Sequence, residues 1–192
     1  MTDWPWPVPV DDGAARHLTK GRALPSIDLP TTDGATVDFS QLPGRTVVFC
    51  YPWTGRPGLA NPPNWDTIPG AHGSTPEAEG FRNLHSAFVG QRVAVHGLSS
   101  QLADHHQELA TRLKLNYPLV SDHDFAWADA LRLPTFETGG TRYLRRLTFV
   151  LSAGKIERVF YPVARPDTHA REVMAWCTAT AGYGAEARLK DS

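Results

Sequence analysis

Runs of apolar residues alternate with amphipathic segments along most of the chain. Residues 47–51 (Val-Val-Phe-Cys-Tyr) form an unbroken apolar run, which is typical of a strand buried on both faces. Over residues 76–88, the spacing of Phe81 and Phe88 puts both rings on one side of a helix, and Pro76 suits the first helical turn. The pattern therefore predicts a sheet that is covered by helices.

The same reasoning gives the other elements. We expect further strands at 93–98, 118–120, 147–151 and 156–161, and further helices at 102–115, 125–131 and 169–181. Ahead of them, Asp33-Gly34 stands between the short segments 26–29 and 36–39 and predicts a β-hairpin. Strands that alternate with helices, followed by a hairpin and a last helix, predict an α/β fold with a mixed sheet.

The composition indicates one globular domain. The chain has 192 residues, of which 41% are hydrophobic and 20% charged. We expect an extended, proline- and tryptophan-containing arm at 1–23, a domain at 24–181 and a small polar tail at 182–192. Proline and glycine are frequent between residues 51 and 73, which predicts a long loop of the kind that is usually functional or disordered.

Charge and cysteine content exclude several classes of protein. Lys+Arg number 19 and Asp+Glu number 20, so there is no electrostatic case for binding nucleic acid or an anionic membrane. The two cysteines make no disulfide framework, and we expect a cytoplasmic protein without signal peptide or membrane span. The eight histidines lack metal-ligand spacing, and no glycine-rich phosphate loop is present, so neither a metal nor a nucleotide is expected.

The chemically most informative position is Ser74, which follows the long loop and opens the helix after it. A side chain at that point meets unpaired backbone N–H groups and the positive end of the helix dipole, a location that lowers the pKa of a cysteine thiol. A serine at this position can also have a purely structural role. Ser74-Thr75-Pro76-Glu77 fits a capping box, with Ser74 as N-cap and Glu77 at the third helical position, and the residues alone favour this interpretation.

Three stretches resemble peroxiredoxins of the bacterioferritin-comigratory type. They are Val-Val-Phe-Cys-Tyr-Pro at 47–52, Gly-Ser-Thr-Pro-Glu-Ala-Glu-Gly-Phe-Arg-Asn at 73–83, and Arg-Leu-Thr-Phe-Val-Leu at 146–151 with Gly-Lys-Ile at 154–156. The resemblance runs from about Leu24 to Cys177. It implies a thioredoxin-like fold, in which helices flank a mixed central sheet and a β-hairpin extends the N-terminal side.

The resemblance also implies an activity and a set of site residues. The activity is thiol-dependent reduction of hydrogen peroxide or organic hydroperoxides, without cofactor. An external thiol (thioredoxin, glutaredoxin or a low-molecular-weight thiol) would regenerate the enzyme. Ser74 occupies the position of the peroxidatic cysteine, and Arg146 would lower the thiol pKa and donate hydrogen bonds to the peroxide. The remaining candidates are Thr54 as a catalytic residue, Pro52, Gly73 and Thr75 as substrate-binding residues, and Cys177 as a resolving thiol.

The departures from the family pattern leave two functions open. Serine at 74 and Glu79 in place of the subtype's resolving cysteine predict a peroxidase scaffold that is inactive as written. Ser74 is then either an introduced replacement or a natural loss. The alternative is a natural thiol-less protein that binds or senses a ligand, or a repurposed enzyme. An insertion separates Thr54 from Ser74, and either a monomer or a homodimer fits the type.

For three of these residues a purely structural role competes with the functional one. Arg146, next to Arg145 at a strand start, is a solvated charge in the competing interpretation. Cys50 lies in a core strand and is expected to be an inert buried thiol. Cys177 lies beside Trp176 on the last helix, where packing competes with the resolving role.

Overall fold

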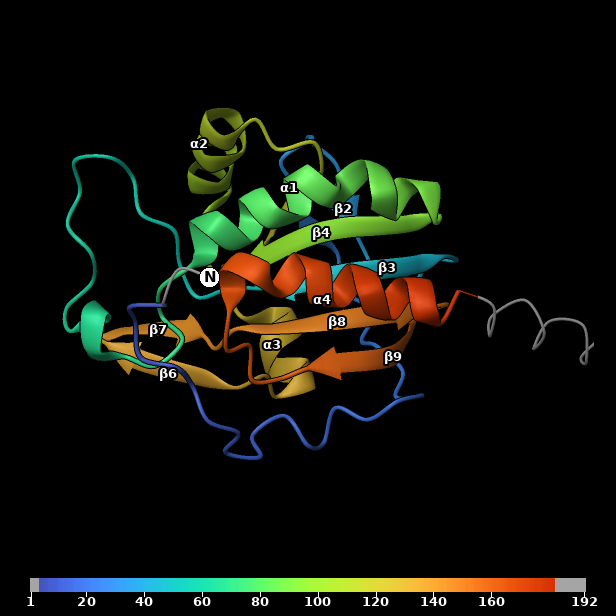
Figure 1. The fold of residues 1–192 in the computed structure, drawn as a ribbon, viewed down its shortest axis with the longest axis horizontal. Coiled ribbons are helices and arrows are strands. Elements are labelled where there is room, and N and C mark those ends of the chain that lie inside the picture. Colours follow the sequence, from blue (N-terminus) through green and yellow to red (C-terminus); the bar gives the residue numbers. More distant parts are fainter. Residues whose placement is uncertain (1–3, 182–192) are drawn as a thin grey trace, which may run out of the picture.

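The computed structural model describes residues 4–181, so the tail expected at 182–192 lies outside the described residues. Its centre is a sheet with the strand order β5-β4-β3-β8-β9 (Figure 1). The strands are β3 (Arg45–Cys50), β4 (Val93–Ser99), β5 (Leu119–Ser121), β8 (Leu147–Ser152) and β9 (Lys155–Phe160). β3, β4 and β5 are parallel, whereas β8 is antiparallel to both β3 and β9. The prediction of a mixed sheet is therefore confirmed.

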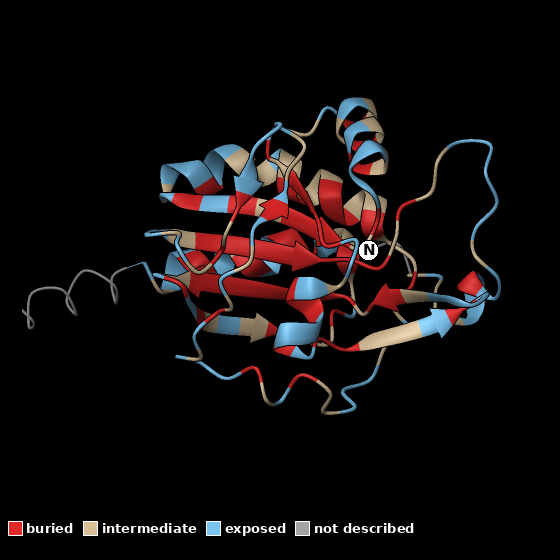
Figure 2. Ribbon diagram, turned by 180° about the vertical axis from the view of Figure 1, so that it is seen from behind, coloured by how far each residue is buried: buried red, intermediate tan, exposed pale blue. Residues whose placement is uncertain are grey.

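Helices cover both faces of this sheet, as Figure 1 shows. The helices are α1 (Ser74–Gly90), α2 (Ala103–Leu113), α3 (Ala126–Leu131) and α4 (Pro166–Ala179). Alternate side chains of β3 enter different cores: Val47 and Phe49 pack with α1, α2 and α4, while Val48 and Cys50 pack with α3. Both faces of β3 are buried, which explains its continuous apolar sequence (Figure 2). Among the described residues, no helix is long and apolar enough to cross a membrane.

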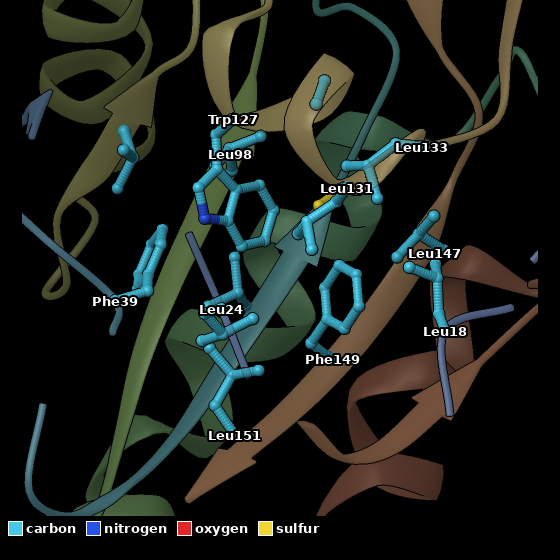
Figure 3. Close-up of a cluster of buried hydrophobic side chains, with 14 of the residues drawn as sticks. Leu18, Leu24, Phe39, Leu98, Trp127, Leu131, Leu133, Leu147, Phe149 and Leu151 are labelled. Atoms are coloured by element: carbon cyan, nitrogen blue, oxygen red, sulfur yellow. The ribbon is translucent and has the colours of Figure 1, made fainter. Parts of the chain in front are cut away.

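The core on the α3 face includes the N-terminal part of the chain. Figure 3 shows Leu18 and Leu24 in one cluster with Trp127 and Phe149. The backbone N–H of Gly21 also donates to the carbonyl of Ile156, the second residue of β9, at 2.8 Å. Residues before position 24, expected as an arm, thus contribute both apolar surface and hydrogen bonds to the domain.

Two small hairpins extend the fold. β1 (Leu29–Pro30) pairs with β2 (Thr36–Val37), which confirms the hairpin predicted at Asp33-Gly34. A second hairpin, β6 (Thr135–Thr138) with β7 (Thr141–Leu144), is not among the predicted elements, although Gly139-Gly140 between two short segments is a hairpin signal. This hairpin holds the long loop, because Trp65 of a short 3₁₀ helix (Trp65–Thr67) packs edge-on against Tyr143 of β7 at 5.1 Å.

We expect Phe81→Ala to lower the free energy of unfolding by about 3–5 kcal/mol, because it removes a buried aromatic ring. The Phe81 ring is fully buried on α1 and stacks on Phe49 of β3, with 4.4 Å between ring centroids. Urea denaturation would measure the loss. The matched control is Val89→Ala on the same helix, where the side chain is exposed and the change should stay within about 0.5 kcal/mol. Equal effects of the two substitutions would show that Phe81 does not anchor α1.

Candidate functional site

The start of α1 depends on a glycine. Gly73 is the N-cap residue and has a φ of 105°, a conformation that other residues rarely adopt. A Cβ atom at this position would lie 2.2 Å from Cγ of Pro166 and 2.8 Å from the ring of Trp4. The prediction that Ser74 is the N-cap is therefore wrong: Ser74 is the first helical residue, and no side chain caps this end of α1. Its hydroxyl is left free for another partner.

That partner is Arg146, which precedes β8 by one residue. Nη2 of Arg146 donates to Oγ of Ser74 at 3.0 Å, and both residues are buried, at 3% and 4% exposure. The same nitrogen lies 3.2–3.4 Å from the carbonyl oxygens of Gly70, Ala71 and His72. The guanidinium thus joins the end of the long loop to the first turn of α1, and the interpretation of Arg146 as a solvated charge is wrong.

Glu77 balances the charge of this buried arginine. Its carboxylate forms an ion pair with Nη1 of Arg146, and both side chains are almost completely buried. Burial raises the pKa of the Glu77 carboxyl above its ordinary value, against the opposing effects of Arg146 and His169. Glu77 therefore does not complete a capping box, because its carboxylate is directed to Arg146 instead.

A cavity of about 300 Å³ opens above Ser74. Four tryptophans line it: Trp4, Trp6, Trp53 and Trp65. Thr54 also lines the cavity despite the insertion that separates it from Ser74, but its hydroxyl donates to Oε1 of Gln101 at 3.1 Å. Gly73 and Thr75 are lining residues as well, whereas Pro52 is buried and lies outside the lining set.

Neither thiol of the chain reaches this cavity. Cys50 is fully buried on the α3 face of β3, and burial, with smaller effects of Asp122 and Glu77, raises the pKa of its thiol well above the usual range. Burial likewise raises the pKa of Cys177 to about 11. At about 1.5 Å per residue, Cys177 lies about 16 Å along α4 from Pro166, the residue that contacts the site. The structure therefore does not bring Cys177 to Ser74.

His72 has a role that the sequence analysis did not find. Its ring stacks on Trp6, with 3.6 Å between centroids and 11° between planes, and its Nε2 lies 2.8 Å from Oδ1 of Asp66. The hydroxyl of Ser74 is occupied by Arg146, so the arrangement is not that of a serine activated by a histidine base. Within residues 4–181, no group of three or more His, Cys, Asp or Glu could hold a metal ion.

A second buried polar pair joins β4 to α2. Oγ of Ser99, at the end of β4, is 2.7 Å from Nε2 of His106 on α2, and neither residue is exposed. The ring of Tyr51 lies 6.1 Å from that of His106. Burial lowers the pKa of His106 to about 3, with a smaller effect of His105. The sequence pattern gave no sign of this pair, since its two residues belong to different elements.

We expect His106 to make the protein less stable in acid. The unfolded chain takes up a proton near pH 6.5 and the folded chain does so only near pH 3, so stability is complete above 6.5 and is lost as the pH falls toward 3. His106→Gln should reduce the slope of unfolding free energy between pH 6.5 and 4 by up to about 1.4 kcal/mol per pH unit. Urea titrations at a series of pH values would measure it. His123→Gln, at a ring that is more than half exposed, is the control, and an unchanged slope in His106→Gln would contradict the assignment.

The sequence of this chain is similar to one known family model and to several known proteins. The model of the AhpC/TSA family matches residues 68–159, a segment that contains both Ser74 and Arg146. A bcp peroxiredoxin of Helicobacter pylori (strain 26695) is 28% identical over 167 residues, which cover 82% of this chain and 96% of the relative. A bcp peroxiredoxin of Coxiella burnetii is 26% identical over 158 residues, with 80% and 95% coverage.

Solved structures agree with these relatives. The peroxidoxin BcpB of Mycobacterium tuberculosis superposes with a TM-score of 0.67 at 25% identity, covering 85% of this chain and 98% of that protein. A cysteine-to-serine variant of Xylella fastidiosa PrxQ has a TM-score of 0.71 at 22% identity, with 86% and 98% coverage. The second likeness shows the shared fold alone.

Proposed function

Because the chain is an AhpC/TSA-family protein with the thioredoxin-like scaffold of a peroxiredoxin, we propose that its site is built for thiol-dependent reduction of hydroperoxides. We propose further that the chain as it stands lacks the peroxidatic thiol and does not turn over. The observation that carries both statements is the hydrogen bond from buried Arg146 to the hydroxyl of Ser74 at the first turn of α1. A cysteine sulfur at this position would have the same arginine as its neighbour.

With a cysteine at position 74, the chemistry follows from the site. The thiolate attacks one oxygen of the hydroperoxide, the O–O bond breaks, and the other oxygen leaves as water or an alcohol after taking up a proton. Arg146 and the positive end of the α1 dipole favour the thiolate, and the guanidinium stabilises the charge that develops on the oxygens. Two equivalents of an external thiol then reduce the cysteine sulfenic acid and release water.

With serine at position 74, this reaction stops at the first step. A hydroxyl is a far weaker acid than a thiol, and the group that is hydrogen-bonded to Oγ of Ser74 is the cationic Arg146, which donates and cannot take up the hydroxyl proton. The two thiols of the chain do not act as the nucleophile in place of a cysteine at position 74, since Cys50 and Cys177 are buried. Unpaired thiols suit a reducing compartment, which supports a cytoplasmic location. The proposed reductant (thioredoxin, glutaredoxin or a small thiol) and the expectation of no cofactor follow from the family resemblance.

The second candidate function is ligand binding without turnover. Its support is the cavity of about 300 Å³, which stays open above Ser74 although the thiol is missing. A natural thiol-less protein of this kind would bind or sense a small molecule, or would have been adapted to another reaction. A serine codon at position 74 in the source gene would favour this candidate, and a cysteine codon would reject it.

We expect Ser74→Cys to acquire hydroperoxide reductase activity. The new sulfur would lie beside Arg146 at the start of α1, where the thiolate form is favoured. Peroxide consumption with dithiothreitol as reductant would measure the gain over the unaltered chain. The matched control is Ser86→Cys on the same helix, which adds an exposed thiol away from Arg146. If Ser74→Cys consumed peroxide no faster than Ser86→Cys, the proposed function would fail.

Adding Arg146→Met to the Ser74→Cys protein tests the role of the arginine. An opposite charge at close range lowers a pKa by about 1–3 units, so its removal should raise the thiol pKa and slow alkylation at pH 7. Peroxide reduction should slow further, by about 10²–10³-fold, because a donor to the developing charge is lost as well. Unchanged alkylation and peroxide rates would show that Arg146 only supports the structure.

A further inference from the structure

The first described residues of the chain lie across the site. The backbone N–H of Gly70 donates to the carbonyl of Pro7 at 3.1 Å, and the ring of Trp6 stacks on His72. The ring of Trp4 approaches Gly73 so closely that a Cβ atom there would lie 2.8 Å from it. Residues 4–9, which we name the tryptophan arm, are thus fixed to the segment that leads into Ser74.

The tryptophan arm supplies two of the four tryptophans that line the cavity. Trp53 and Trp65 from the long loop supply the others and pack edge-on, with 5.4 Å between ring centroids. The chain has six tryptophans, so most of them surround this one space. The cavity of about 300 Å³ exceeds the share of about 30 Å³ that a water molecule takes in the liquid by roughly tenfold. The cavity therefore has room for a molecule larger than hydrogen peroxide.

Polar groups lie between the tryptophans, from Thr54, Asn61 and His72 as well as from Ser74 and Thr75. At the start of α1, the N–H groups of Ser74 and Thr75 have no partner within the helix, because the first turn of a helix leaves its donors free. Aromatic rings beside polar groups suit a small molecule that carries both a ring and an oxygen. Such a ligand would place a ring against the tryptophans and an oxygen at the start of α1.

We propose that this cavity binds an aromatic molecule with an oxygen head group, such as an aryl-alkyl hydroperoxide or its alcohol, and that Trp4 and Trp6 select the aromatic part. The choice of head group rests on the proposed function, whereas the choice of ring rests on the tryptophans alone. The tryptophan arm lies outside the segment, residues 68–159, that matches the AhpC/TSA model.

Binding to the unaltered full-length chain tests the proposal without any variant. Cumyl alcohol and tert-butyl alcohol carry the same tertiary hydroxyl and differ by one phenyl ring. Titration calorimetry should give a dissociation constant about tenfold lower for cumyl alcohol, the gain expected from aromatic contacts. Equal affinities, or no measurable binding of either alcohol, would overturn the proposal.

Substitutions then test whether the tryptophan arm is responsible for the preference for cumyl alcohol. Trp6→Ala should remove most of the preference for cumyl alcohol, whereas Val10→Ala, at a side chain that is 80% exposed on the next part of the chain, should retain it. Thermal melts would check that both variants fold. If folded Trp6→Ala kept the full preference, the tryptophan arm would not be the selective wall, and the proposal would be wrong.

Kinetics separates this proposal from the proposed function. In the Ser74→Cys protein, Trp6→Ala should lower the ratio of kcat/KM for cumene hydroperoxide to kcat/KM for hydrogen peroxide by about tenfold. If Ser74→Cys were inactive but the unaltered chain preferred cumyl alcohol, the proposed function would fail and the binding site would stand. If Ser74→Cys were active and its kcat/KM ratio did not change on Trp6→Ala, the proposed function would stand and the aromatic binding site would fail.

Discussion

The site of this protein depends on one buried cation, the guanidinium of Arg146. It pairs with Glu77 on α1, donates to the hydroxyl of Ser74 and reaches the carbonyl oxygens at the end of the long loop. Removing a charge from water costs several kcal/mol, so such a group persists only where its partners are well placed. The position of α1, the path of the loop and the surroundings of residue 74 are therefore parts of one arrangement.

This arrangement explains how the site keeps its hydrogen bonds with a serine at position 74. The serine hydroxyl accepts the hydrogen bond that a thiolate would accept, and the charge of Arg146 is still balanced by Glu77. Serine thus fits both the hydrogen bond and the ion pair of the site. The Trp6–His72 stack and the Trp53–Trp65 contact likewise depend on no sulfur atom. A cavity of about 300 Å³ lies above Ser74 in this arrangement, and the second candidate function, ligand binding, is based on it.

The sequence predicted those features that depend on local pattern or on the family motif. The continuous apolar run of β3 and the spacing of Phe81 and Phe88 placed the central strand and α1 correctly. The motif placed Ser74 and Arg146, and the structure brings the two together. The capping box was wrong, because the close approach of Pro166 fixes Gly73 at the N-cap, and a contact with a distant segment cannot be read from neighbouring residues.

Other contacts of the site could not be predicted either, because they also join residues from distant segments. The tryptophan arm returns to His72 across more than sixty positions of the sequence, and the Ser99–His106 pair joins a strand to a helix; neither leaves a periodic signal. The β6–β7 hairpin is a different case, because Gly139-Gly140 is a local turn signal. Long-range contacts of this kind have to be observed in the structure.

A double-mutant cycle on Arg146 and Glu77 tests the central claim most directly. The free energy of unfolding would be measured for the unaltered chain, Arg146→Met, Glu77→Met and the double variant. Each single substitution leaves one charge buried without its partner and should cost about 3–5 kcal/mol, while the double variant should lose less than either. Single losses below about 1 kcal/mol, or losses that simply add in the double variant, would contradict a buried ion pair as the basis of the site.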